Sequence, residues 1–270
     1  MTQQIKWFLT KLPPWCERFI MFVVRIVFYY GFYRGDKYIC PCCGKGQKKF
    51  KIIKTSHFSA NSTAHIETQV LCTYCCSLPR QRVICHWLYH FANSAPKWQK
   101  TILFAPEPCT VRYLRKADIP FKTSDLFRKG CDLQLDLCDI RLPDNSQDLI
   151  ICNHILEHVP SDTKAISELA RILKDTGTAL IVVPMDLDLD VTKEEAADDP
   201  HSSKSRARMR TQMFGQQDHV RLYGRDFIAK LENHFTVTVF DGSKVDRNIM
   251  PKYGPFALDV NLLFVCTIAN

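Results

Sequence analysis

Residues 148–153 read DLIICN and residues 178–183 read TALIVV. Each is a short, continuous apolar run, which is typical of strands buried on both faces of a parallel sheet. Between them, residues 161–174 (SDTKAISELARILK) repeat apolar side chains at helical spacing, and Ser161 suits the N-cap position. Strand, helix and strand in this order predict a βαβ unit with a right-handed crossover.

The same alternation continues on both sides of this unit. The other predicted strands are residues 101–105, 121–125, 132–136, 235–240 and 261–268, and the other predicted helices of this part are residues 109–117 and 223–233. Strands that alternate with helices predict an α/β fold, a Rossmann-like doubly wound sheet of seven strands. In such sheets the ligand binds beyond the carboxyl ends of the strands.

Polar residues stand at these carboxyl ends. In chain order they are Ala105-Pro106-Glu107, Asp125, Asp136 and Asn153-His154. A carboxylate after the second strand can accept hydrogen bonds from ribose hydroxyls, and a polar group after the third can hold an adenine amino group. The pattern therefore predicts a cofactor that contains adenosine.

Two cysteine pairs predict a metal site. Cys40 and Cys43 form one C-x2-C pair, and Cys72 and Cys75 form the other. Two such turns can supply the four thiolates of a structural zinc site, with no open position for catalysis. Gly44 fits the turn after the second thiolate, and alternating residues between the pairs predict a small hairpin. Unliganded reduced cysteines and extracellular disulfides stay open as alternatives.

The cysteine pairs also suggest how the chain is divided. An amphipathic helix over residues 83–91 follows the second pair, and the polar, proline-containing residues 92–100 suggest a domain boundary. We therefore expect an N-terminal apolar and basic helix (1–37), a zinc-knuckle unit with its linking helix (38–95), and an α/β domain (96–270). Its long polar stretch, about 185–217, is expected to form a lid.

Composition supports a folded chain with two different halves. Of 270 residues, 46% are hydrophobic, which excludes general disorder. Residues 1–98 hold 14 Lys/Arg and 3 Asp/Glu, a net charge of +11, whereas residues 99–270 hold 22 and 25, a net charge of −3. A basic unit of this kind can meet anionic lipid or nucleic acid, or serve as a solubilising surface.

The apolar stretch at residues 19–33 contains Arg25 and is too short to span a membrane comfortably. It predicts a helix that packs on a domain, with a membrane-surface helix as the alternative. We expect a cytoplasmic protein, and peripheral contact with the inner face of the membrane stays open.

Several ordered motifs resemble a known family. Residues 135–162 (LDLCDIRLPDNSQDLIICNHILEHVPSD) and 168–184 (ELARILKDTGTALIVVP) resemble class I S-adenosylmethionine-dependent methyltransferases of the type-11 group. The chain is similar to a subset with a C-x2-C-x-S-x2-R-x-R segment, here Cys72 to Arg82, an APE loop at residues 105–107, and a late DHVRLYGRD stretch at residues 218–226.

The resemblance implies S-adenosylmethionine as the cofactor and assigns residues to its parts. The implied contacts are Ala105, Pro106 and Glu107 around the methionine moiety, Asp125 with Leu126 at the ribose, Asp136 and Leu137 at the adenine, and Asn153 with His154 on the methionine side. Common members have a glycine-rich first loop, but this chain has no glycine between Thr101 and Lys129.

One further motif has a rival interpretation. His154-x-x-Glu157-His158 matches the spelling of an inverted zinc-protease motif. That chemistry needs the motif inside a helix, whereas here it directly follows a buried strand and Pro160 limits any helix. The segment is therefore expected to line the cofactor pocket.

The expected reaction is methyl transfer to an oxygen or nitrogen atom. A small-molecule or glycan acceptor is favoured because residues 99–270, which would hold the pocket, are acidic overall. A hydroxyl acceptor would need a base. His219 is the first candidate, followed by His158 and Glu157, and a structural role stays open for each. The alternatives are an RNA methyltransferase or RNA-binding module that uses the basic zinc unit, and a non-catalytic scaffold, suggested by the glycine-free loop.

Overall fold

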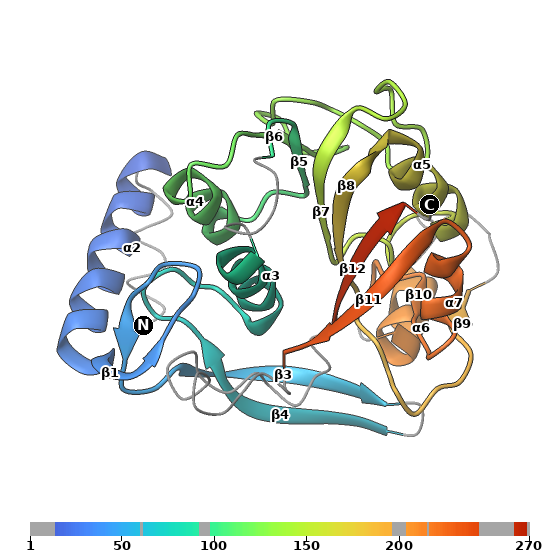
Figure 1. Cartoon of the computed structure of the whole chain (residues 1–270). Helices are drawn as coiled ribbons and strands as arrows, with labels where there is room; N and C mark the ends of the chain where they lie inside the picture. The colour runs from blue at the N-terminus through green and yellow to red at the C-terminus, as the bar shows by residue number, and fades with distance from the viewer. Residues whose placement is uncertain are drawn as a thin grey trace.

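A six-stranded sheet forms the centre of the computed structural model, which describes residues 14–59, 62–91, 98–195, 204–214, 216–242 and 262–268 (Figure 1). The strands, in their order across the sheet, are β11 (Phe235–Asp241), β12 (Leu262–Ile268), β8 (Leu173–Val182), β7 (Gln147–Asn153), β5 (Thr101–Phe104) and β6 (Phe121–Ser124). From β8 to β6 the strands are parallel, while β12 runs antiparallel to both of its neighbours. Four parallel strand ends therefore meet at one edge.

Helices cover both faces of this sheet. Figure 1 shows α3 (Pro79–Phe91) and α4 (Pro108–Lys116) on one side, and α5 (Asp162–Ile172) and α7 (Phe227–Glu232) on the other. Strand β7 belongs to both cores, since Leu149 and Ile151 pack with α3 and α4 while Ile150 and Cys152 pack with α5 and α7. The predicted α/β class and doubly wound arrangement are confirmed.

The predicted strand at residues 132–136 is absent from the described sheet. In the described structure this segment makes two isolated bridges, a parallel one between Ser124 and Leu133 and an antiparallel one between Asp136 and Asp139. Its aspartates bind backbone groups instead, because Asp132 accepts from the Thr123 amide (2.7 Å) and Asp136 accepts from the Cys138 amide (2.8 Å). Such local side-chain bonds compete with a strand ladder, so the sheet has six strands rather than seven.

Two predicted boundaries also move. Strand β8 begins at Leu173, directly after α5, rather than at Thr178. Helix α7 begins at Phe227 rather than at residue 223, because Asp226 accepts from Thr192 N (2.8 Å) and holds the preceding residues in a turn.

The zinc-knuckle unit contains two hairpins. Strands β1 (Arg34–Ile39) and β2 (Gly46–Gln47) form one, and β3 (Lys51–Ser59) and β4 (Ser62–Leu71) form the other, which was predicted. Buried Arg82 of α3 donates to the carbonyls of Val70 (2.7 Å) and Ser77 (2.9 Å). This guanidinium also lies over the Phe50 ring at 4.3 Å, so α3 is tied to the hairpin that precedes it.

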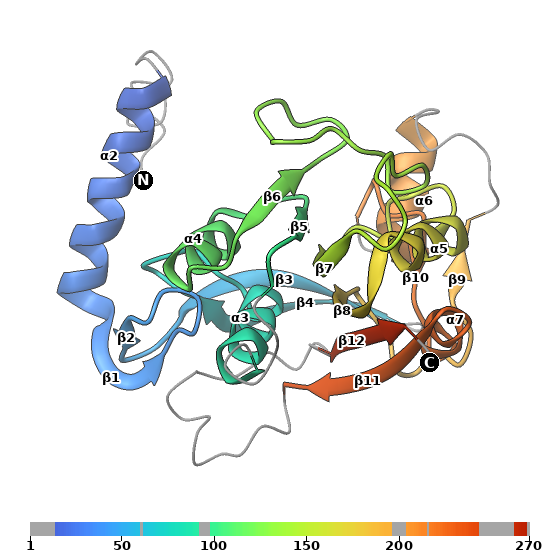
Figure 2. The ribbon, with the colours of Figure 1, turned by 45° about the horizontal axis from the view of Figure 1, so that its top comes forward.

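Helix α2 (Pro14–Phe28) continues into a π-helical turn, η1 (Tyr29–Tyr33). Figure 2 shows α2 standing at the edge of the molecule. Its apolar side chains include Phe19 and Val27, exposed by 63% and 65%, which differs from the expected packing against a domain. Among the described residues, no helix is both long and apolar enough to cross a membrane.

The segment after β8 contains short elements. They are β9 (Lys193–Glu194), α6 (Lys204–Phe214) and β10 (Arg221–Leu222), with β9 and β10 paired antiparallel. Parts of the predicted lid and of the predicted domain boundary, residues 196–203, 215 and 92–97, lie outside the described residues. The three domain limits and the lid therefore stay predictions.

Candidate cofactor and metal sites

The loop after β5 turns at Ala105, which has a φ of +44°. This is the left-handed region that glycine enters easily and alanine enters at a cost of about 1–2 kcal/mol. The chain thus makes a glycine-like turn without a glycine. A strained residue that persists at a strand end is typical of a functional loop.

Glu107, at the start of α4, joins this loop to two other elements. Its Oε1 accepts from Arg80 Nη2 (3.1 Å) and from Gln81 Nε2, both on α3, and its Oε2 accepts from Asn153 Nδ2 (2.7 Å) at the end of β7. The helix of the zinc-knuckle unit therefore contributes side chains to the predicted cofactor loop. Sequence reasoning missed this role of Arg80 and Gln81.

Asp125 lies directly after β6, as predicted. Its Oδ1 accepts from the amides of Phe127 and Arg128 (both 2.9 Å), which turns the chain. The neighbouring Leu126 is 40% exposed. Arg128 Nη1 donates to the Pro106 carbonyl (2.8 Å), so the loops after β5 and β6 are tied together.

Asp136 and Leu137 differ in their exposure. Asp136 is half-buried, whereas Leu137 is 5% exposed and packs in the core with Ile102 and Phe104. An adenine ring at this edge could contact the Asp136 carboxylate. It could contact the backbone of Leu137, because the side chain of that residue is buried.

Asn153, at the end of β7, has a side-chain oxygen that can accept a hydrogen bond. Its Oδ1 is buried and has no hydrogen-bond partner within the described structure. Buried polar atoms are normally paired, so an orphan beside a strand end fits a ligand donor there. Next to it, His154 has a φ of +54°, a second strained residue at this edge. The residues present thus fit a polar ligand such as the predicted cofactor.

A cavity of about 780 Å³ lies on the outer side of β6 and α4. Of the predicted cofactor residues, its lining includes Pro106 alone, together with Arg115, Arg128 and Asp132. This cavity therefore differs from the carboxyl edge of the strands, where the other predicted cofactor residues lie.

Glu157 lies beside the carboxyl edge and is fully buried. Three histidine nitrogens surround its Oε1: His154 Nδ1 at 3.0 Å, His219 Nε2 at 3.9 Å and His158 Nε2 at 4.0 Å. The structure thus brings together the three predicted catalytic residues, from two segments about 60 residues apart in sequence.

These groups differ in their protonation. Burial lowers the pKa of His219, which favours the neutral imidazole. Burial alone would raise the pKa of Glu157, but the neighbouring histidines, with His154 first, hold this pKa below its usual value. The cluster therefore combines an ionised carboxylate with an imidazole that can accept a proton.

Arg221, which sequence reasoning missed, holds the two segments of this cluster together. Its guanidinium is fully buried and donates to the carbonyls of Leu156 (2.6 Å) and Val159 (2.7 Å). It also donates to the Pro160 carbonyl (3.3 Å) and to Glu194 (2.5 Å). A buried arginine can satisfy several carbonyls at once because its donors form a planar fork.

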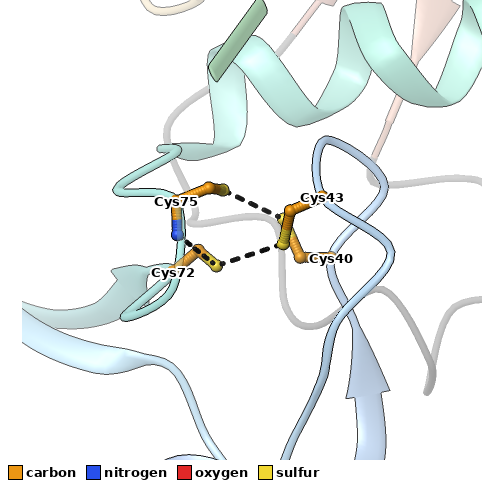
Figure 3. A group of neighbouring side chains, drawn as sticks. All are labelled: Cys40, Cys43, Cys72 and Cys75. Carbon is orange, nitrogen blue, oxygen red and sulfur yellow. Dashed lines mark hydrogen bonds between the residues drawn. The ribbon is translucent and has the colours of Figure 1, made fainter. Parts of the chain in front are cut away.

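The four predicted metal-binding cysteines converge, as Figure 3 shows. The sulfurs of Cys40 and Cys75 lie 3.7 Å apart, those of Cys43 and Cys72 lie 3.9 Å apart, and all four lie within 4.8 Å of one another. Zinc–sulfur bonds of about 2.3 Å in a tetrahedron place the sulfurs about 3.8 Å apart. The donor set and its spacing therefore fit a tetrahedral zinc ion.

Each of the two C-x2-C knuckles ends in a turn of the same kind. The amide of Gly44 donates to the Cys40 carbonyl (2.7 Å), and the amide of Cys76 donates to the Cys72 carbonyl (2.8 Å). Gly44 has a φ of +70° and Cys76 a φ of +61°. Cys76, which is not part of a C-x2-C pair, thus occupies a position where glycine costs less.

The surroundings of the sulfurs also suit a metal. Gln47 Nε2 donates to Cys72 Sγ (2.8 Å), and Ser77 Oγ lies 3.2 Å from the sulfurs of Cys40 and Cys75. Such outer contacts orient and stabilise thiolates. Burial raises the pKa of Cys42, which lies outside the cluster, so its thiol stays protonated.

Comparisons with known proteins agree with this fold. Residues 114–181 match a family model described as a methyltransferase domain. Similar solved structures include a 1,6-didemethyltoxoflavin-N1-methyltransferase from Burkholderia thailandensis (14% identity, 71% of this chain, 77% of that chain, TM-score 0.44) and the CurJ carbon methyltransferase (14%, 71%, 54%, 0.47). Another is the YcgJ protein from Bacillus (14%, 68%, 99%, 0.41).

At these identities and scores, the similarity is not evidence of a shared substrate. No curated protein matches the chain. The match of residues 114–181 to the methyltransferase family model confirms the resemblance of the sequence motifs to S-adenosylmethionine-dependent methyltransferases.

Proposed function

We propose that the chain transfers a methyl group from S-adenosylmethionine to a small-molecule or glycan acceptor. The observation that carries this proposal is the meeting of Ala105, Glu107, Asp125 and Asn153 at the carboxyl edge of the parallel strands, where α/β sheets bind ligands. The acidic balance of residues 99–270 favours a small acceptor over a polyanion.

Each residue at the edge has an expected part. The free oxygen of Asp125 would accept the ribose hydroxyls, with Leu126 beside them, and Asp136 would face the adenine amino group. Glu107 and Arg80 carry opposite charges and suit the ammonium and carboxylate of the methionine moiety. The Asn153 oxygen would accept from the same moiety, and His154 would line it.

The cofactor supplies an activated methyl group on a sulfonium ion. The chain has to hold the acceptor in line with that bond, and such positioning can contribute roughly 7–11 kcal/mol to lowering the barrier. For a hydroxyl acceptor, His219 would accept the proton, because its imidazole is neutral and its Nε2 faces Glu157. His158 lies next to it and is the second candidate.

Calorimetry with S-adenosylhomocysteine tests the cofactor site. Asp125→Ala should lose measurable binding, while Asp118→Ala, at the far end of α4, should bind as the wild type does. Equal affinity in both variants would remove Asp125 from the site. No binding to the wild type would favour a non-catalytic scaffold, and RNA affinity that falls steeply with salt would favour the RNA-binding alternative.

We also propose a structural zinc ion held by Cys40, Cys43, Cys72 and Cys75. Support comes from the sulfur spacing and from the Gln47 donor at Cys72. Elemental analysis of the folded protein should find zinc bound, and Cys43→Ser should lose it. A wild-type protein that folds without metal would reject this site.

A second role concerns the exposed face of α2, which we propose docks on an anionic membrane surface. Phe19, Val27 and Phe32 are more than 60% exposed, and the exposed Arg34 and Lys49 stack on nearby tyrosines of η1. An apolar face beside basic groups is typical of interfacial helices.

Sedimentation with vesicles tests this docking. The wild type should sediment with phosphatidylserine vesicles, and Phe19→Ser/Val27→Ser should not. The exposed substitution Val239→Ser on β11 is a matched control. Failure of the wild type to sediment would overturn the proposal.

A further inference from the structure

We propose that Glu157, His158 and His219 form a second metal site, for a divalent first-row transition ion such as zinc. The three ligand atoms lie within 4.8 Å of one another, and the site shares no residue with the cysteine cluster. Two imidazoles and one carboxylate are a donor set that proteins use for catalytic zinc and related ions, with coordination positions left open.

The hydrogen bonds of the two histidines fix which ring nitrogen faces Glu157. His158 Nδ1 lies 3.1 Å from the Asp218 carbonyl, and His219 Nδ1 lies 3.1 Å from the Phe214 carbonyl. A carbonyl can only accept, so each Nδ1 carries the proton and donates. In the neutral rings each Nε2 is then an acceptor, directed toward an anionic carboxylate.

Three acceptor atoms thus converge, and one donor, His154 Nδ1, lies beside them. Buried Oε2 of Glu157 has no hydrogen-bond partner in the described structure, and only His154 Nδ1, at 3.0 Å, approaches Oε1. Acceptors that face one another in a buried site repel unless a cation lies between them. A positive charge among these three atoms would relieve the repulsion, and a divalent ion would supply it.

The spacing requires only a small adjustment. Metal–nitrogen and metal–oxygen bonds of about 2.0–2.1 Å place tetrahedral ligands about 3.4 Å apart. Glu157 Oε1 now lies 3.9 Å from His219 Nε2 and 4.0 Å from His158 Nε2. Each of these two separations would shorten by about 0.5 Å, and the third separation, between the two imidazole nitrogens, is at most 4.8 Å.

The site also has what a working metal centre needs around it. The carbonyls that hold both Nδ1 protons orient the imidazoles, as partners of metal-bound histidines do. His158 has a side chain 32% exposed, which leaves a path from solvent. The ion would sit beside the end of β7. If the proposed function holds, the bound ion would replace His219 as the group that eases loss of the proton from an acceptor hydroxyl, because a metal-bound Nε2 cannot accept a proton.

Cobalt titration of the full-length protein prepared with one zinc ion per chain tests ion binding without any cofactor. The wild type should bind one further equivalent of Co²⁺, with visible d–d bands and no thiolate charge-transfer band. His219→Gln and Glu157→Gln should each weaken this binding at least a hundredfold, and His234→Gln, remote in the turn before β11, should not.

The proposal is overturned if the wild type binds no second equivalent, or if a second equivalent persists in both site variants. A cobalt spectrum with thiolate bands only would also count against it. S-adenosylhomocysteine binding is measured on the same His219→Gln protein. If His219→Gln still binds the cofactor analogue but no longer binds cobalt, the ion site is distinct from the proposed cofactor site. If the wild type binds cobalt but not the analogue, the proposed function is rejected and the ion site is not.

Discussion

Replacing Arg221 with methionine tests whether this buried guanidinium holds the loop after β7 in place. Methionine keeps much of the side-chain volume but has no donor. The variant would leave the carbonyls of Leu156 and Val159, now bonded at 2.6 and 2.7 Å, without their partner, and Asp162 would keep Lys230 as its cationic partner.

The magnitude follows from burial. Arg221 is fully buried, and removing one member of a buried charged network costs about 3–5 kcal/mol. For a protein of this size, 1 kcal/mol corresponds to roughly 2–4 °C in Tm, so the melting temperature should fall by about 10 °C. The matched control is Arg225→Met, four residues away, whose ion pair with Asp190 is 62% and 85% exposed. It should change stability by about 0.5 kcal/mol or less.

Urea unfolding followed by circular dichroism measures both variants, and hydrogen exchange locates the effect. In Arg221→Met the amides of residues 154–159 should exchange faster, while the β3–β4 hairpin should exchange as before. The reasoning is refuted if Arg221→Met loses less than about 1 kcal/mol, or if it behaves like the exposed control.

Three further outcomes are expected. Cys76→Gly should raise the free energy of unfolding by about 1 kcal/mol, because glycine relieves the positive φ, whereas Cys76→Ala should leave it unchanged in the same denaturation assay. Burial lowers the pKa of His86 to about 4, from 6.5 in the unfolded chain, so the unfolded state binds more protons between these values. Stability should therefore fall by roughly 2–3 kcal/mol as the pH drops from 7 to 4.5, and His86→Phe should lack this loss in pH-dependent unfolding. Arg80→Met removes one charged partner of Glu107 and should weaken S-adenosylhomocysteine binding about tenfold by calorimetry, with the melting temperature nearly unchanged.

The parts of the fold that sequence could predict are those with a local signal. The buried runs that became β7 and β8 are apolar on both faces, and Ser161 caps α5 by accepting from Lys164 N (3.2 Å). The convergence of the four cysteines was predictable for another reason, because a tetrahedral zinc site requires four sulfurs close to one another.

The parts that sequence missed depend on partners far along the chain. Arg221 bonds to carbonyls 61 to 65 residues away, and Arg80 lies 27 residues from Glu107. The residues next to an arginine in the sequence do not show whether its side chain will be buried or exposed. Residues 132–136 were predicted as a strand because apolar and polar side chains alternate there. In the structure the Asp132 carboxylate accepts a hydrogen bond from the Thr123 amide, and this side-chain bond competes with regular strand pairing.

Segments outside the sheet therefore decide what its carboxyl edge can do. On α3, Arg82 binds the carbonyls that lead into the knuckle, while Arg80 and Gln81 bind Glu107. A zinc ion with four thiolate ligands has no open position for chemistry, yet it would fix the start of this helix and, through it, the carboxylate at the cofactor loop. With the proposed zinc bound, the position of Glu107 would depend on the metal through α3, which would give a structural zinc unit a direct reason to precede a methyltransferase domain.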